Sequence, residues 1–233
     1  MENNKKNLCQ KALISRILTL EIEPGAMLDE TALSNEYGLS RTPLREVFQR
    51  LAGEGYLTLM QNRGAKVSSM DLESMRNFFQ AAGMIYASIA RLAAENSTSG
   101  QIIKLSQIQK RFKNSFKTDN ASATALLNHE FHAYMGEIAA NPYLTPSYNR
   151  LLIDHTRIRQ RFYRPASPRD EARIDTASQQ HDDLIEAISD HATGEAVQIT
   201  LEHWALTKNR IEHFVHPDPL SHDIDEIPEG SDK

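Results

Sequence analysis

Apolar residues recur at helical spacing along almost the whole 233-residue chain, and one short segment departs from that spacing. The clearest helix carries Leu44, Val47, Phe48 and Leu51 at i, i+3, i+4 and i+7, so these side chains share one face. In segment 56–68, two short apolar runs flank a polar turn, which is typical of a β-hairpin. The sequence therefore predicts a mainly α fold with a single hairpin in its N-terminal part.

Helix breakers divide the first 70 residues into an ordered series of elements. A first amphipathic helix ends before Pro24 and Gly25. A second helix, 30–37, ends at Gly38, because glycine takes the left-handed conformation of a helix end at little cost. A third helix begins after Ser40, a good N-cap residue. Two helices joined by a glycine turn and followed by a hairpin are the layout of a winged helix-turn-helix.

A polar face lies beside the apolar face of the third helix and is expected to point outward. An arginine in the major groove bonds guanine O6 and N7, and a hairpin tip reaches the adjacent backbone or minor groove. The alternative is an ordinary solvated surface, and the order of the elements favours the DNA-binding interpretation. The candidate DNA-contact residues are Arg41, Thr42, Arg45 and Gln49 on the helix and Arg63 and Gly64 in the hairpin.

Charge is distributed unevenly along the chain. The net charge is −5, yet residues 1–70 carry nine lysines and arginines against eight acidic residues. Residues 217–233 carry six acidic residues, one lysine and three prolines, so a disordered acidic tail is expected there. The overall acidity therefore does not argue against a DNA partner.

The rest of the chain, 71–216, is expected to form an antiparallel bundle of six helices, separated by prolines and glycines. The expected helices are 71–96, 99–117, 121–139, 142–163, 167–191 and 194–213. The predicted domains are a winged helix-turn-helix in 1–70, an all-helical domain in 71–216 and the tail in 217–233. The longest apolar stretch, 78–90, is too short for a membrane span, and the single cysteine and polar N-terminus indicate a cytoplasmic protein.

Three histidines and one asparagine in the second domain are candidate metal ligands. Asn128 and His132 are four residues apart and share one helix face. His181 and His203 lie at equal distances from the turn between the last two helices, so antiparallel packing brings them level. Spacing alone leaves two alternatives open, hydrogen-bonded core histidines or imidazoles arranged around a divalent metal.

The N-terminal segment resembles the DNA-binding domain of GntR-family bacterial transcription regulators. The resemblance covers residues 8–68 and is carried by the runs EPGAMLDE (23–30), YGLSRTPLREVFQRL (37–51), EGYL (54–57) and NRGAKV (62–67). It implies that Arg41, Arg45, Arg63 and Gly64 contact operator DNA. Residues 71–216 are similar to the all-helical (FCD) ligand-binding domain of the FadR-type branch.

Metal-containing members of that branch use Asp-x-x-x-His on one helix and one histidine from each of the last two helices. His132, His181 and His203 match this pattern, and Asn128 stands at the aspartate position. Because asparagine brings no charge, the resemblance implies a weaker site that favours zinc or nickel.

The branch also carries an arginine and a glutamate in the first helix of this domain, where this chain has Ala82 and Tyr86. The resemblance implies a small carboxylate effector that binds at an open metal position. Candidate effector contacts are Tyr86, Arg157 and Arg161, although a solvated face is the more common role for such arginines.

The expected function is a ligand-responsive regulator that binds double-stranded operator DNA as a homodimer. One alternative is a metal-dependent enzyme, since three histidines with open coordination positions also describe catalytic sites. Glu130, the acid nearest in sequence, points away from the face shared by Asn128 and His132. A second alternative is a regulator whose metal has a purely structural role.

Overall fold

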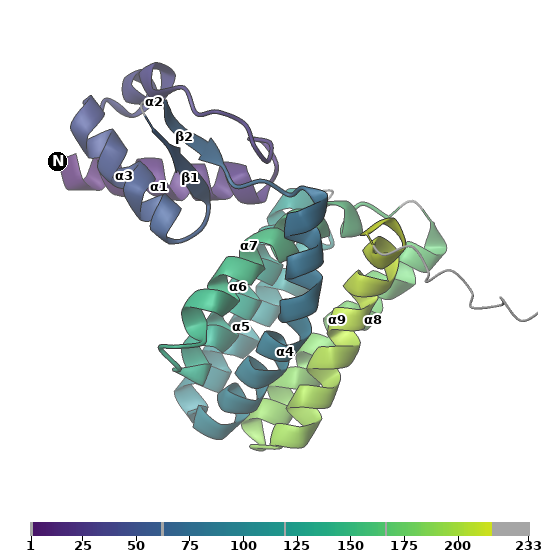
Figure 1. The fold of residues 1–233 in the computed structure, drawn as a ribbon. Helices are drawn as coiled ribbons and strands as arrows, with labels where there is room; N and C mark the ends of the chain where they lie inside the picture. Colours follow the sequence, from purple (N-terminus) through teal and green to yellow (C-terminus); the bar gives the residue numbers. More distant parts are fainter. Residues whose placement is uncertain (1, 62, 119, 166, 216–233) are drawn as a thin grey trace, which may run out of the picture.

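The computed structural model describes residues 2–61, 63–118, 120–165 and 167–215, and its elements form a small N-terminal unit above a helical bundle (Figure 1). We call residues 2–68 the reading head. It consists of α1 (Glu2–Leu18), α2 (Glu30–Tyr37), α3 (Arg41–Gly53), β1 (Leu57–Met60) and β2 (Gly64–Val67). The predicted winged helix-turn-helix is therefore confirmed.

The core of the reading head is the apolar face that the sequence predicts. Leu44, Val47, Phe48 and Leu51 of α3 are all buried, and they pack with Leu13 and other apolar residues of α1. Local signals set the ends of α2. The Asp29 carboxylate accepts hydrogen bonds from the first backbone N–H groups, and Gly38 ends the helix at φ +59°.

The two strands pair antiparallel, with Leu57 opposite Val67 and Met60 opposite Gly64. Gly64 has a φ of +78°, a conformation that side chains with a Cβ rarely adopt. A short bridge between Met27 and Lys66 ties the segment before α2 to the hairpin. The hairpin is thus fixed against the helices of the reading head.

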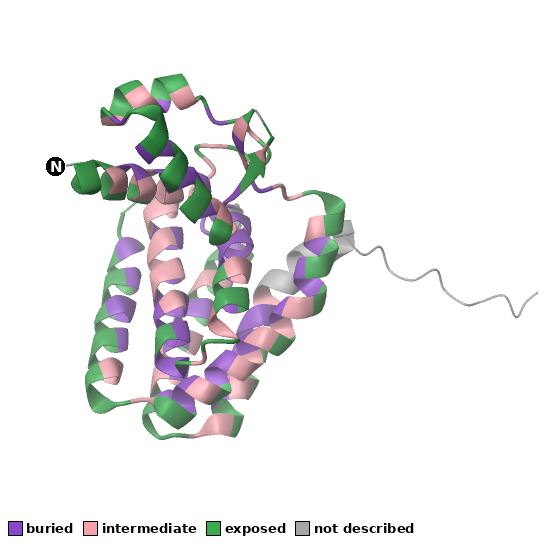
Figure 2. Cartoon of the chain, turned by 60° about the vertical axis from the view of Figure 1, so that its left-hand side comes forward, coloured by how far each residue is buried: buried purple, intermediate pink, exposed green. Residues whose placement is uncertain are grey.

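Six helices form the bundle, within one or a few residues of the predicted limits. They are α4 (Leu72–Asn96), α5 (Ser99–Ser115), α6 (Ala121–Ala139), α7 (Thr145–Phe162), α8 (Pro168–Ser189) and α9 (Thr193–Val215). Most of them bury one face and expose the other, as amphipathic helices do (Figure 2). Side-chain caps at Asp71, Thr98, Asn120 and Ser167 begin α4, α5, α6 and α8.

Helix α7 connects the bundle to the reading head. Ile153 belongs to the hydrophobic core of the reading head, although it lies on a bundle helix. The Arg157 guanidinium donates to the backbone oxygen of Ser68 at 2.9 Å and to its Oγ at 2.7 Å. The Gln160 amide donates to the Leu18 carbonyl at 3.0 Å. The last residues of α1 and the segment before α4 are therefore both tied to α7.

Among the described helices, none combines the length and the apolar character needed to cross a lipid bilayer. The predicted acidic tail, 217–233, lies outside the described residues.

Candidate nucleic-acid interface and candidate metal centre

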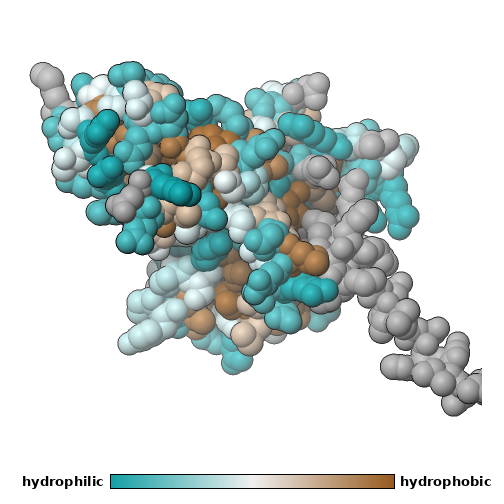
Figure 3. All heavy atoms as spheres, turned by 45° about the horizontal axis from the view of Figure 1, so that its top comes forward, coloured by the Kyte–Doolittle hydropathy of each residue, from teal (hydrophilic) through white to brown (hydrophobic). Residues whose placement is uncertain are grey.

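Helix α3 presents its polar face to solvent on the outer side of the reading head. Arg41, Thr42, Arg45 and Gln49 are exposed, while the opposite face of the helix is buried. Arg63, in the turn between the strands, is exposed as well. The view in Figure 3 shows mainly hydrophilic residues over this part of the molecule. The arginines, Thr42 and Gln49 among the predicted contact residues are thus exposed on the reading head.

Glu30, at the start of α2, is a member of this surface that the sequence analysis missed. Its carboxylate lies 3.4 Å from the Arg45 guanidinium. A Cβ added at Gly64 would lie 3.0 Å from the same carboxylate, so Glu30 stands between the third helix and the hairpin. Because Arg45 retains 62% side-chain exposure, the pair orients that arginine without covering it. An acidic residue in the first turn of a helix is common because it interacts favourably with the helix dipole. The sequence therefore gave no indication that Glu30 pairs with Arg45.

Three histidines from three helices meet inside the bundle. Their candidate ligand nitrogens, from His132 on α6, His181 on α8 and His203 on α9, all lie within 4.8 Å of one another, and all three residues are buried. Asn128, one turn before His132, is buried beside them. Phe131 stacks on the His181 ring with centroids 4.0 Å apart and holds that ring in place. We call this group the histidine chamber.

Glutamine side chains fix the orientation of two of the imidazoles. The Gln109 amide nitrogen donates to the Ser178 carbonyl at 2.9 Å and to Asp182 at 3.1 Å, so its Oε1 faces His181. An amide oxygen only accepts, hence His181 Nδ1 carries the proton and donates to it at 3.0 Å. His203 Nδ1 pairs with Gln180 Oε1 at 3.1 Å in the same way. The Nε2 atom of His181 therefore presents a free lone pair to the chamber, whereas the Nε2 lone pair of His203 accepts from the Arg159 guanidinium at 2.9 Å.

The chamber meets the chemical requirements of a metal site. Burial, followed by the nearby Arg159 charge, lowers the pKa of His132 to about 3. Burial also places the pKa values of His181 and His203 well below the usual range, so all three imidazoles are neutral ligands. Within the described part of the chain, the Nε2 atoms of His132 and His181 have no hydrogen-bond partner. Neutral imidazoles with unpartnered nitrogens are suitable donors for a metal ion.

Arg159 is the residue of the chamber that the sequence analysis missed most clearly. Its guanidinium lies 2.9 Å from His203 Nε2 and donates to His155 Nε2 at 3.1 Å. It also contacts the Tyr163 hydroxyl at 3.4 Å, and that hydroxyl donates to Asn128 Oδ1 at 2.9 Å. Sequence spacing contains a signal, because Arg159 lies four residues after His155 on the buried face of α7.

The candidate effector contacts have different positions. Tyr86 lines a small cavity of about 10 Å³ next to His132 and His203. Arg157 is buried and turned toward Ser68 and Asp154, away from the chamber, so the expectation of a solvated face is wrong for this residue. Its side chain is covered because α7 passes beneath the reading head. The Arg161 side chain lies outside what the structure describes.

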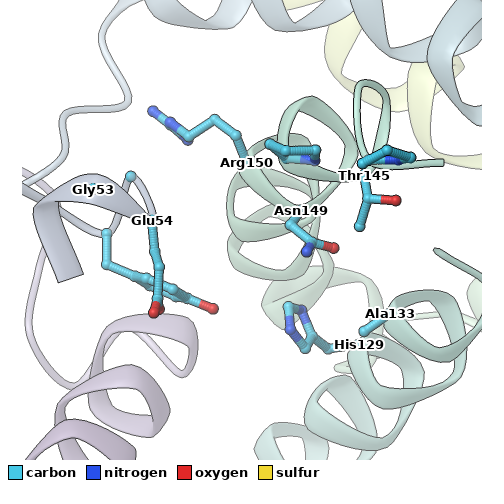
Figure 4. A pocket seen from close by; sticks show the side chains of 11 residues that line it. Gly53, Glu54, His129, Ala133, Thr145, Asn149 and Arg150 are labelled. Carbon is cyan, nitrogen blue, oxygen red and sulfur yellow. The ribbon is translucent and has the colours of Figure 1, made fainter. Parts of the chain in front are cut away.

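A larger groove, of about 620 Å³, lies between the reading head and the bundle. Figure 4 shows Gly53 and Glu54 on one side and Asn149, Arg150 and His129 on the other. Two of its polar side chains already have partners, since Arg150 pairs with Asp154 at 2.9 Å and His129 bonds Thr156 at 2.8 Å. Among the described residues, buried atoms of His132 and His181 in the histidine chamber, and of Tyr86 and Thr200 in the small cavity beside it, have no hydrogen-bond partner, which makes the chamber the better candidate ligand site.

Two family models match the chain. Residues 9–67 match "Bacterial regulatory proteins, gntR family", and residues 77–206 match the FCD domain. The repressor RspR of Escherichia coli K12 is 26% identical over 76% of this chain and 75% of its own length. The Nta operon transcriptional regulator of Aminobacter aminovorans is 30% identical over 88 residues, and that match spans only 42% of the regulator and 38% of this chain.

Solved structures show the same fold. McbR/YncC of E. coli superposes with a TM-score of 0.71 at 16% identity, over 88% of this chain and 98% of that protein. A transcriptional regulator GntR from Rhodococcus sp. RHA1 gives a TM-score of 0.65 at 14% identity, over 93% of this chain and 100% of that protein. With both family models matched in order along one fold, the chain belongs to the gntR family of bacterial regulatory proteins, in the branch whose second domain is an FCD domain.

Proposed function

We propose that this protein is a transcription regulator that binds operator DNA through the reading head and responds to a small ligand held in the histidine chamber. The observation that carries the proposal is the position of α7, which contacts both the histidine chamber and the reading head. Arg159 of α7 lies in the chamber, while Arg157 and Gln160 hold Ser68 and Leu18 of the reading head. A ligand that moves α7 would therefore change the position of the DNA-contact residues.

The DNA-contact residues of the proposal are Arg41, Thr42, Arg45 and Gln49 of α3, with Arg63 and Gly64 of the hairpin. Arginines at the start of an exposed helix suit direct contact with base edges, and the hairpin suits contact with the backbone. We propose that the protein acts as a homodimer in the cytoplasm, because two copies of the reading head would match a pseudo-palindromic operator.

In the chamber, His132, His181 and His203 would hold a divalent metal, zinc or nickel, with Asn128 beside them. Such an ion would supply a Lewis-acid position for a carboxylate oxygen of the effector. The residues of the chain orient the ligands, since Gln109 and Gln180 fix two imidazoles and Phe131 supports one ring. Tyr86 lines the adjoining cavity and would contact the effector. We make no effector assignment for Arg157 or Arg161.

A catalytic role is the weaker alternative, because the acid nearest the chamber in sequence is engaged elsewhere. Glu130 forms an ion pair with Arg111 at 2.7 Å on the surface of the bundle. A general base needs to lie within hydrogen-bond reach of the reacting group, and this carboxylate faces away from the histidines.

The proposal is tested by selecting binding sites from a random duplex library and measuring affinity for the selected DNA by fluorescence anisotropy. We expect the affinity to fall steeply with salt, because phosphate contacts release counterions. Arg45→Ala should lower it by about 1–3 kcal/mol. Arg91→Ala removes the same charge from an exposed bundle position and should have little effect. Equal losses for the two variants would refute the assignment of α3.

Chelation separates a regulatory metal from a structural one. Removal of a structural metal lowers the melting temperature and leaves the effector response of the folded protein unchanged, whereas removal of a regulatory metal abolishes that response.

A further inference from the structure

The Glu30 carboxylate is an acidic group within the surface proposed to contact DNA. Glu30 is the first residue of α2, and its side chain lies between Arg45 of α3 and Gly64 of the hairpin. A negative charge at this position repels the phosphate backbone and therefore lowers the affinity for a duplex of any sequence. A contribution of Glu30 to recognition must then come from its effect on neighbouring side chains.

The two oxygens of the Glu30 carboxylate have different surroundings. Oε2 lies 3.4 Å from the Arg45 Nη2. Oε1 is buried, has no hydrogen-bond partner among the described residues, and would lie 3.0 Å from a Cβ at Gly64. The Glu30 side chain is 19% exposed, compared with 62% for Arg45. The hairpin thus covers the carboxylate, and the carboxylate in turn faces a guanidinium that is open to solvent.

Packing alone does not fix the direction of the Arg45 side chain. A groove of about 230 Å³ lies beside it, between α3 and the hairpin, and leaves the guanidinium room to move. An arginine side chain has many rotamers, and the selection of one of them on binding costs conformational entropy. The ion pair with Glu30 selects one direction before DNA arrives.

A guanidinium held in this way favours one kind of DNA complex over another. At the operator, an acceptor that meets the held guanidinium binds it at a low entropic cost, because arginine has five N–H donors and needs few of them for Glu30. In a non-specific complex, affinity comes from phosphates that the side chains reach by adjusting their positions. An Arg45 that moves to such a phosphate leaves the Glu30 carboxylate without its cation beside a polyanion. The pair therefore weakens the non-specific complex more than the operator complex.

We propose that Glu30 is a specificity-determining residue, which holds Arg45 and thereby raises the ratio of operator affinity to non-specific DNA affinity. This inference rests on the proposed function and assigns a role to a residue outside the proposed DNA contacts. Specificity is a difference between two binding free energies, so a residue also raises it by weakening the wrong complex. Glu30 is a positioning residue that acts through Arg45 and needs no contact of its own with a base.

The experiment compares the affinity of the full chain for its selected operator duplex with that for a scrambled duplex of the same length and composition, by fluorescence anisotropy at several salt concentrations. Glu30→Gln keeps the size of the side chain and removes its charge. It should bind the scrambled duplex about three- to tenfold more tightly, with a salt slope steeper by about 0.9, because the released Arg45 gains one phosphate contact. Operator affinity should rise less or fall, so the ratio of the two affinities should drop at least about threefold.

Glu36→Gln is the matched control, because Glu36 lies on the same helix and its carboxylate pairs at 3.4 Å with Arg16, an arginine outside the proposed contacts. It removes the same charge and should leave the affinity ratio and the salt slope unchanged. Glu30→Ala removes both oxygens and should reproduce the effects of Glu30→Gln. In an Arg45→Ala background, loss of the Glu30 charge should no longer steepen the salt slope or lower the ratio.

An unchanged ratio in Glu30→Gln and Glu30→Ala would overturn the proposal, as would an equal change in Glu36→Gln or a change that persists in the Arg45→Ala background. Failure of the proposed function gives a different result, in which no duplex is selected or Arg45→Ala binds the selected duplex as tightly as the unchanged protein. A protein that needs Arg45 for its operator, yet keeps its affinity ratio when Glu30 is replaced, would refute only the present inference.

Discussion

Replacement of Arg157 by methionine should loosen the junction between the reading head and the bundle. The Arg157 side chain is 0% exposed and makes two hydrogen bonds to Ser68, and it lies 3.4 Å from Asp154. Methionine has a similar length and fills the space, but it leaves the Ser68 oxygens unpaired and removes one of the two cations beside the buried Asp154 carboxylate.

The size of the effect follows from these contacts. A hydrogen bond to a charged group is worth about 1.5–3 kcal/mol, and loss of one partner of a buried ion pair costs about 3–5 kcal/mol. Part of this cost is offset, because burial lowers the pKa of Arg157 and so indicates that the charge is costly to bury. We therefore expect the free energy of unfolding to fall by about 3 kcal/mol.

Arg150→Met is the matched control, because Arg150 pairs with the same carboxylate. Its side chain is 40% exposed, so its loss should cost about 1 kcal/mol or less. Urea denaturation is followed by circular dichroism for the whole chain and by fluorescence of Trp204, the single tryptophan, which packs in the bundle core. In Arg157→Met, the two signals should separate as the reading head unfolds first. Equal costs for the two variants, or coincident transitions in Arg157→Met, would show that Arg157 does not hold the domains together.

Three further substitutions test the core, the hairpin and the chamber. Ile153→Ala should lower the free energy of unfolding by about 2–5 kcal/mol and weaken operator binding, whereas Ile188→Ala, in the bundle core, should lower the free energy of unfolding alone. Urea titration measures the stability of both variants, and fluorescence anisotropy measures their operator binding. Intact DNA binding in Ile153→Ala would contradict the place of Ile153 in the core of the reading head. Gly64→Ala should cost about 1–3 kcal/mol in the same urea assay, since its φ is +78° and the new Cβ would meet Glu30, and an unchanged midpoint would argue against a fixed hairpin turn. Gln109→Leu should reduce Zn²⁺ affinity by about 10–100-fold by calorimetry because His181 loses its orienting acceptor, and an unaltered affinity would exclude His181 as an oriented ligand.

Much of the fold was predictable because local signals and burial agree along this chain. The apolar face of α3 from Leu44 to Leu51, the left-handed end of α2 at Gly38 and the caps before the bundle helices are all local properties. The level positions of His181 and His203 followed from the symmetry of an antiparallel turn, and the place of His132 beside them was implied by the resemblance to the FCD domain. Such features depend only on the residues of one or two neighbouring elements, so they can be predicted from the sequence.

The roles of the α7 arginines were decided by the tertiary structure. Arg157 and Arg159 have the same chemistry and lie two residues apart, so the helix turns them to different sides. Arg157 forms hydrogen bonds to Ser68, 89 positions earlier in the chain, and Arg159 contacts His203, 44 positions later. Burial of a guanidinium depends on polar partners that distant segments bring to it, and spacing along one helix does not contain those partners. The sequence by itself therefore determined the elements, their order and the level positions of His181 and His203. Only the tertiary structure decided that Arg159 lies in the chamber and that Arg157 holds the reading head.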